Sequence, residues 1–224
     1  MKSKIHVVGT LILLSALVFQ DSASAQINNV IGKREIDVQS CKLLIKPSVH
    51  GEIMSPREEN DFKFAGYSET LNSNGVKQRF GFSIGCVDGV TDKSEVAKEH
   101  GGYFEPEKKK WAAYYVDDQD KEQLASVTHI YAITAVNGNG FARTTDDVIG
   151  DPRQRARSLS YCLFSGTKAI CGEGQVMNLS DPKANFLPTV FNVLRSVEFV
   201  DGNPSDQAAV NASGAAATTV PVGK

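Results

Sequence analysis

The stretch Ser158 to Met177 constrains the fold most, because it has the pattern of a β-hairpin with one cysteine in each strand. Gly166-Thr167 fits a two-residue turn of type II′, which takes glycine at its first central position. Counting outward from that turn, Cys162 faces Cys171 in a non-hydrogen-bonded pair, with Cα atoms about 4.5 Å apart. A disulfide accepts this separation. The sequence therefore predicts a disulfide across the hairpin.

The N-terminus has the pattern of a secretory signal peptide. Lys2 and Lys4 precede an apolar run over residues 5–19, and Ala23-Ser24-Ala25 closes it. The apolar run is shorter than the ~20 residues that a membrane-spanning helix needs. We therefore expect cleavage after Ala25, no integral membrane segment in the mature chain, and a periplasmic or secreted location.

The four cysteines of such an exported chain suggest two disulfides. If Cys162 pairs with Cys171, Cys41 remains to pair with Cys86. Metal ligation is the alternative. Zinc sites usually have two cysteines or two histidines at short spacing, and neither pattern occurs in this sequence. We expect two disulfides and no metal site.

The mature chain is nearly neutral. The whole chain has 24 basic and 26 acidic side chains, and removing Lys2, Lys4 and Asp21 leaves 22 and 25, a net charge of −3 with histidine neutral. The chain therefore lacks the excess of positive charge that is typical of proteins that bind nucleic acid or an anionic membrane. The expected partner is another envelope or secreted protein, and not a nucleic acid.

Alternating apolar runs separated by turn signals predict several strands. Asn74-Gly75 lies between runs over residues 62–71 and 76–87, which is a strong hairpin signal. Residues 36–46 have the pattern of one strand, and the polar residues 50–61 are predicted to form a loop. Residues 127–136 are apolar on both faces, which is typical of a central strand.

Two helices are expected between and after these strands. Asp92 and Glu95 form an acidic capping box for a short helix over residues 93–99. Near the end, an apolar stripe that consists of Leu187, Val190, Phe191 and Leu194 predicts an amphipathic helix.

The expected fold class is α+β, an antiparallel sheet of about six to eight hairpin-built strands with a C-terminal helix packed on it. It forms one domain over residues 26–201, followed by a disordered tail over residues 202–224.

Residues 81–85 match the G-x-S-x-G motif of α/β-hydrolases, with Ser83 at its centre. That motif needs a sharp turn from a strand into a helix. Here the alternation of a strand continues through the motif, which places Ser83 on the solvent face of that strand. A small secreted serine hydrolase is the alternative function, and it would need His100 or His129 with an acid such as Asp117.

Two further patterns, a group of aromatic residues and a glycine-rich segment, are candidate binding sites. Trp111, Tyr114 and Tyr115 are the aromatic residues that a glycan or small-ligand binder would use, although Trp111 also suits a core. Gly172-Glu173-Gly174 lacks the helix start that a phosphate-binding loop requires. No cofactor is predicted.

The closing segment Leu187 to Val200 runs from a helix through Arg195-Ser196 into a short strand at Val197-Glu198-Phe199. This pattern resembles the end of the small α+β sandwich domains of the PsbP-like group, over about the last third of the ordered chain. Many domains of that group are non-catalytic adaptors or envelope proteins, so the resemblance implies no active-site residues. The resulting hypothesis is an exported, non-enzymatic accessory, inhibitor or immunity-type protein that acts by protein–protein binding in the bacterial envelope.

Overall fold

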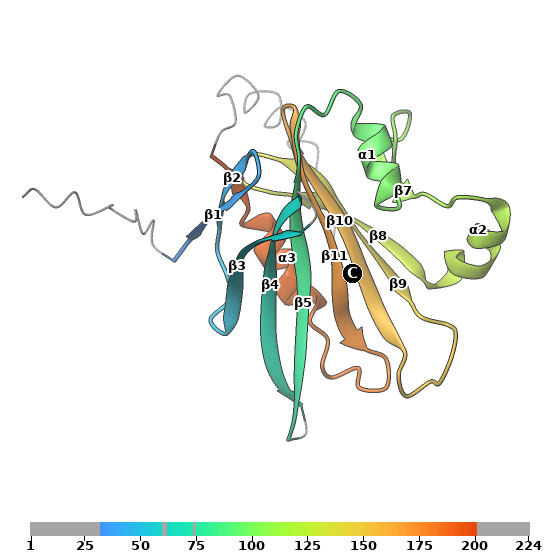
Figure 1. The fold of residues 1–224 in the computed structure, drawn as a ribbon. Helices are drawn as coiled ribbons and strands as arrows, with labels where there is room; N and C mark the ends of the chain where they lie inside the picture. Colours follow the sequence, from blue (N-terminus) through green and yellow to red (C-terminus); the bar gives the residue numbers. More distant parts are fainter. Residues whose placement is uncertain (1–31, 60–61, 74, 201–224) are drawn as a thin grey trace, which may run out of the picture.

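A computed structural model describes residues 32–59, 62–73 and 75–200, which fold around one large antiparallel sheet (Figure 1). The predicted signal peptide and the predicted disordered tail lie outside the described residues. The α+β class, the hairpin-built sheet and the C-terminal helix are as predicted from the sequence.

The large sheet has seven strands in the order β3-β4-β5-β11-β10-β9-β8. Neighbouring strands are antiparallel throughout, and β5 and β11 join its two halves. The strands are β3 (Gly51–Glu59), β4 (Phe62–Ser73), β5 (Val76–Val87), β8 (Thr128–Thr134), β9 (Asn139–Asp146), β10 (Ala156–Ser165) and β11 (Lys168–Asn178).

Two smaller sheets and the helices pack against this sheet. One small sheet has the order β1-β2-β12 and the other is the hairpin β6-β7. The strands are β1 (Arg34–Val38), β2 (Cys41–Ile45), β6 (Gly102–Glu105), β7 (Lys110–Ala113) and β12 (Glu198–Phe199). The helices are α1 (Lys93–Glu99), α2 (Asp118–Leu124), the 3₁₀ turn η1 (Ala125–Val127) and α3 (Leu187–Arg195). Figure 1 shows α3 against one face of the large sheet, with α1, β7 and α2 grouped near β8 and β9.

The main core lies between the large sheet, α3 and the sheet β1-β2-β12. We call the face of the large sheet toward this core the inner face. Aromatic rings dominate it, with Tyr67 stacked on Phe82 at 5.1 Å between ring centroids and Phe80 stacked on Phe186 at 5.7 Å. The predicted apolar stripe of α3 faces the same core, where Val190 is fully buried. Burial of these side chains is the main source of stability in such a core.

The opposite face, which we call the outer face, is covered over only part of its width. Over β9 and β10, a second cluster forms beneath α1 and the β6-β7 hairpin. There the ring of Trp111 lies 4.9 Å from that of Phe141 and 5.9 Å from that of Phe164. Over β3, β4 and β5, the outer face is open in the described part of the chain.

Both predicted disulfides are present. In the β10-β11 hairpin Cys162 pairs with Cys171, with a Cα–Cα distance of 4.1 Å. The turn has a positive φ of 56° at Gly166 and not at the following threonine, as a type II′ turn requires. The second disulfide joins Cys41 of β2 to Cys86 of β5 and so ties the small sheet to the inner face.

The prediction of one strand over residues 36–46 is wrong. The segment folds back on itself as the hairpin β1-β2, with Val38 paired to Cys41. Gln39 makes the turn with a positive φ of 53°, a conformation that its side chain does not favour. Pairing β1 with β2 buries Ile36 and Val38, which compensates for that local cost.

Two further expectations for the sheet are wrong. Residues 50–61 were expected to form a loop, but most of them form β3, whose ladder shifts between Met54 and Arg57 around Pro56. Proline is tolerated there because β3 is an edge strand. The strand expected to be central, β8, also lies at an edge. It is apolar on both faces because Tyr131 packs on Phe191 of α3, and Ile130 packs on the outer cluster.

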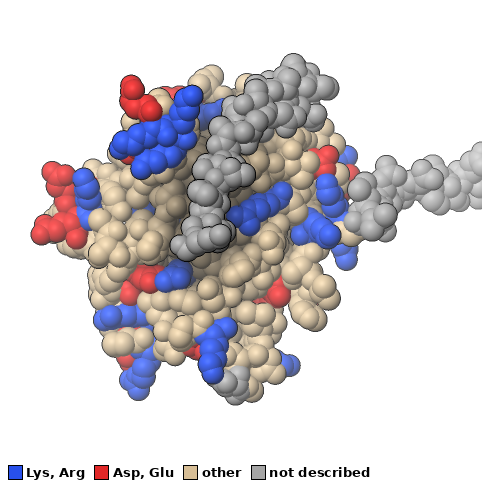
Figure 2. Space-filling model, turned by 180° about the vertical axis from the view of Figure 1, so that it is seen from behind, with Lys and Arg blue, Asp and Glu red and all other residues tan. Residues whose placement is uncertain are grey.

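The face seen from behind in Figure 2 carries charges of both signs. Figure 2, the view from behind, shows lysine and arginine side chains in several small groups, with aspartate and glutamate close to them. Among the described residues, no helix is both long enough and apolar enough to cross a membrane.

We expect the Cys41–Cys86 disulfide to stabilise the fold more than the hairpin disulfide does. Its cysteines are 45 residues apart in the sequence, whereas Cys162 and Cys171 are 9 apart. The chain-entropy model gives about 4 kcal/mol for the longer loop and about 3 kcal/mol for the shorter one. Urea unfolding of the two double alanine variants measures both losses, and the reverse order would contradict this expectation.

Candidate binding groove on the outer face of the sheet

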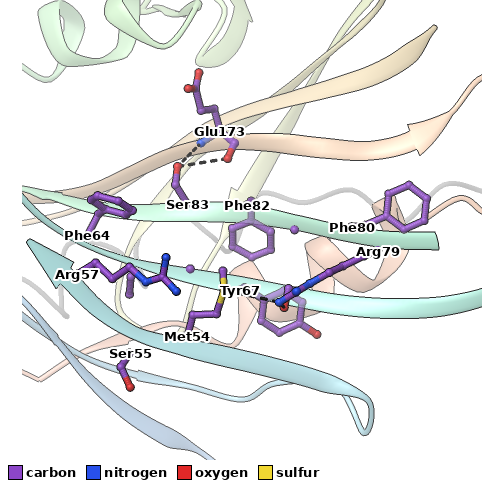
Figure 3. Close-up of a pocket in the computed structure, with 14 residues that line it drawn as sticks. Met54, Ser55, Arg57, Phe64, Tyr67, Arg79, Phe80, Phe82, Ser83 and Glu173 are labelled. Atoms are coloured by element: carbon purple, nitrogen blue, oxygen red, sulfur yellow. Dashed lines mark hydrogen bonds between the residues drawn. The ribbon is translucent and has the colours of Figure 1, made fainter. Parts of the chain in front are cut away.

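The open part of the outer face contains a groove of about 580 Å³ across β3, β4 and β5, with one residue from β11 at its rim. This volume falls within the range of about 300–1,000 Å³ that is typical of small-molecule sites. Its lining includes Met54, Arg57, Phe64, Arg79, Ser83 and Glu173, all labelled in Figure 3. We call this feature the outer-face groove.

The floor of the groove is mostly backbone, because every outward-facing pair of β4 and β5 in this region contains a glycine. Gly66 faces Ser83, Ser68 faces Gly81, and Phe64 faces Gly85. At Gly81 a side chain has no room, since an added Cβ would lie 2.5 Å from the carbonyl oxygen of Tyr67. The large side chains of the same strands point to the inner face, as the pleat of a strand requires.

Two arginines lie on the β3 side of the groove. Arg79 Nη2 donates a hydrogen bond to Ser68 Oγ at 2.9 Å and also approaches Met54 Sδ at 3.8 Å. Among the described side chains, neither Arg57 nor Arg79 forms an ion pair. Figure 3 shows Met54 between the two guanidinium groups in that view. This side of the groove is therefore cationic.

The apolar part of the groove comes from Met54 and Phe64. Met54 lies over Gly66, where an added Cβ would be only 2.3 Å from Met54 Cε. The methionine is 36% exposed and unbranched, so it can move aside at little cost. Phe64 is half-buried beside Arg57, its cross-strand neighbour. The groove combines an apolar wall with positive charge.

The hydroxyl of Ser83 is engaged in the sheet itself. Ser83 Oγ donates to the carbonyl oxygen of Glu173 at 3.2 Å and accepts from the Glu173 N–H at 3.0 Å, as the dashed lines in Figure 3 mark. The Ser83 carbonyl accepts a 2.9 Å hydrogen bond from Tyr161 Oη. Complete burial raises the pKa of Tyr161, so this hydroxyl stays protonated as a donor. Ser83 thus joins β5 to β11 within a continuous strand, and not at a strand-to-helix turn.

The residues that a hydrolase would need do not meet at Ser83. His129 is exposed on β8, which three strands separate from β5. Asp117 caps α2, where its side chain accepts a hydrogen bond from the Asp120 N–H at 2.7 Å. No histidine side chain is hydrogen-bonded to Ser83 among the described residues.

His100 lies elsewhere on the outer face, beside the hairpin disulfide. It ends α1, and its carbonyl accepts a 2.8 Å hydrogen bond from Ser160 Oγ. Burial lowers the pKa of its imidazole, and the carboxylates of Glu99 and Glu173 only partly oppose that shift. A ring nitrogen lies within 4.8 Å of the Cys162 and Cys171 sulfurs, but these sulfurs are bonded to each other. His100 is therefore neutral at physiological pH and faces an oxidised pair.

The aromatic residues considered for glycan binding are engaged in packing. Trp111 lies among the rings of the outer cluster, described above. The ring of Tyr114 lies 6.0 Å from Lys98 Nζ, and that of Tyr115 lies 5.7 Å from the guanidinium carbon of Arg143. These rings belong to the covered half of the outer face, apart from the outer-face groove.

The sequence reasoning missed the residues that give the groove its character. Met54 and Arg57 fall in the segment interpreted as a loop, so the sequence did not predict that they lie on a strand beside β4. The sequence offered one signal for the groove, the small residues at Gly81, Ser83 and Gly85. They mark a strand face that has no large side chains.

A scan against protein-family models found no matching family, and a search of the curated proteins found no similar sequence. The resemblance to the PsbP-like group stays a prediction.

We expect Ser83→Ala to destabilise the fold by about 1–2 kcal/mol, because it leaves two backbone groups of Glu173 without their partner. Ser158→Ala is the matched control, since the Ser158 hydroxyl makes a single bond to the Thr145 carbonyl at 3.0 Å. Urea unfolding compares the two variants. Labelling of Ser83 by a fluorophosphonate probe in the folded protein would contradict this structural role.

Stability should fall as the pH decreases below about 6.5, the usual pKa of histidine. Burial lowers the pKa of His100 in the folded state, so below that pH the unfolded chain binds the proton first. Proton uptake by the unfolded state then favours unfolding. Free energies of unfolding measured from about pH 7.5 to about pH 5.5 should fall less in His100→Gln than in the wild type. An identical pH dependence in both proteins would refute the assignment.

Proposed function

We propose that the protein is an exported, non-enzymatic binding protein of the bacterial envelope and that the outer-face groove is its binding site. One observation carries the proposal: within residues 32–200 as far as the structure describes them, the sheet leaves β3, β4 and β5 uncovered on a face that is covered over β9 and β10. An antiparallel sheet often has one solvated face, but a recess with apolar and charged walls on such a face is the usual form of a binding site.

Export is supported by the signal-peptide pattern and by the two disulfides, which form and persist in oxidising compartments. The same observations support a periplasmic or secreted location. The expected partner is another envelope or secreted protein, with the chain acting as an accessory, inhibitor or immunity-type protein. The resemblance to the PsbP-like group supports a role without catalysis.

A small-ligand binder is the second candidate function. The volume of the groove, about 580 Å³, favours it, because that space matches a molecule of modest size better than a flat protein interface. A serine hydrolase gains no such support, since the Ser83 hydroxyl is engaged with the Glu173 backbone.

Site-specific photo-cross-linking tests the proposal. A photoreactive amino acid in place of Met54, at the groove, should give an adduct of defined mass in envelope preparations. The same amino acid in place of Val116, which is 81% exposed beyond the groove, should give none. Gly66→Leu, which fills the groove floor from a strand position, should suppress the Met54 adduct. Equal adducts from both positions, or none from either, would count against the groove as the binding site.

A further inference from the structure

We infer that the outer-face groove binds a small amphipathic carboxylate, with one anionic head and an apolar chain. This inference rests on the proposed use of the groove as a binding site and on its second candidate function, small-ligand binding, and it specifies the chemistry of the ligand. It follows from the charge, the hydrogen-bond acceptors and the apolar surface of the groove, taken in turn.

The charge of the groove favours an anion. Arg57 and Arg79 approach Met54 from two sides in Figure 3, and neither has an acidic partner among the described side chains. Arginines in proteins commonly pair with carboxylates, and their planar donors match the two oxygens of a carboxylate. Two unpaired guanidinium groups at one recess therefore form a receptor for a carboxylate head.

One of the two present partners of Arg79 is a poor acceptor. Arg79 Nη2 approaches the Met54 thioether sulfur at 3.8 Å, and such a sulfur is only a weak acceptor. A carboxylate oxygen at the same place would make a shorter, charge-assisted bond. Ser68 Oγ, 2.9 Å from Arg79 Nη2, holds the guanidinium in position for that exchange. The head of the ligand would thus displace the Met54 side chain.

The apolar chain of the ligand has a surface to cover. From Met54 the groove continues over the backbone of Gly66 toward Phe64, and Gly85, the cross-strand neighbour of Phe64, adds no side chain to the floor. A flexible chain of several methylene groups fits such a channel and removes apolar surface from water. On the β11 side, the exposed carboxylate of Glu173 repels a second anion, so the head is directed to the β3 side.

Calorimetric titration of the mature protein with decanoate tests the inference, with decanol as the neutral control of equal chain length. Decanoate should bind at one site per chain, and decanol should bind about ten-fold more weakly. Rising salt should weaken decanoate binding and leave decanol unaffected.

Charge-removing variants identify the receptor. Arg79→Gln and Arg57→Gln should each weaken decanoate binding about ten-fold, and should leave decanol binding unchanged. Arg153→Gln is the matched control, because Arg153 is an exposed arginine paired with Asp151 on a loop outside the groove. It should bind decanoate as the wild type does.

A pair of substitutions at Met54 gives a second test that does not depend on removing a charge from the arginines. Met54→Glu places a carboxylate within reach of Arg79 and should compete with the ligand, lowering decanoate affinity about ten-fold. Met54→Gln has a similar size without the charge and should bind decanoate nearly as the wild type does. Met54 is exposed enough for both variants to fold.

The outcomes separate this inference from the proposed function. Equal binding of decanoate and decanol, unaffected by the arginine variants, would overturn the carboxylate receptor and keep the groove as a binding site. Absence of any decanoate binding would also overturn the inference, while the cross-linking experiment at Met54 decides independently whether the groove is used. Cross-linking to a protein, together with no decanoate binding, would make an acidic partner segment the occupant.

Discussion

The alternation of side chains along β5 determines both the core and the candidate site. Large residues such as Phe80, Phe82 and Ile84 point inward, where they are at least 96% buried. Gly81 and Gly85 occupy alternate positions on the other face, where they leave the backbone of β5 bare. Because successive side chains of a strand point to opposite faces, this one sequence pattern places large side chains on the inner face and small residues on the outer face. The packing of α3 and the existence of the groove are two consequences of the same alternation.

Cross-links then hold this two-faced sheet in place. Cys41–Cys86 ties the small sheet to the inner face, whereas Cys162–Cys171 lies on the outer face at the border of the covered region. Ser83 adds a further link, because its hydroxyl joins β5 to β11 at the seam between the two halves of the sheet. A residue that resembles a nucleophile in the sequence is thus part of the construction, and the groove beside it has features of binding and not of acid–base chemistry.

Local patterns and tertiary pairing differ most at the edges of the sheet. The polar sequence of β3 has no strand signal of its own, and it becomes a strand because β4 offers unpaired backbone groups. The apolar faces of β8 suggested a central position, although they are covered by α3 on one side and by the outer cluster on the other. In both cases, the neighbours of the strand decide its structure, and those neighbours are distant in the sequence.

The sequence by itself determined the features that depend on near neighbours in the chain. These are the Gly166 turn with the Cys162–Cys171 register, the Asn-Gly hairpin, the cap of α1 and the apolar stripe of α3. Turn geometry and helix periodicity fix such features within a few residues. Only the tertiary structure brought Arg57 of β3 and Arg79 of β5 to one recess, because strand order across a sheet depends on long-range packing. The pairing of these two arginines therefore had no signature in any single stretch of the chain.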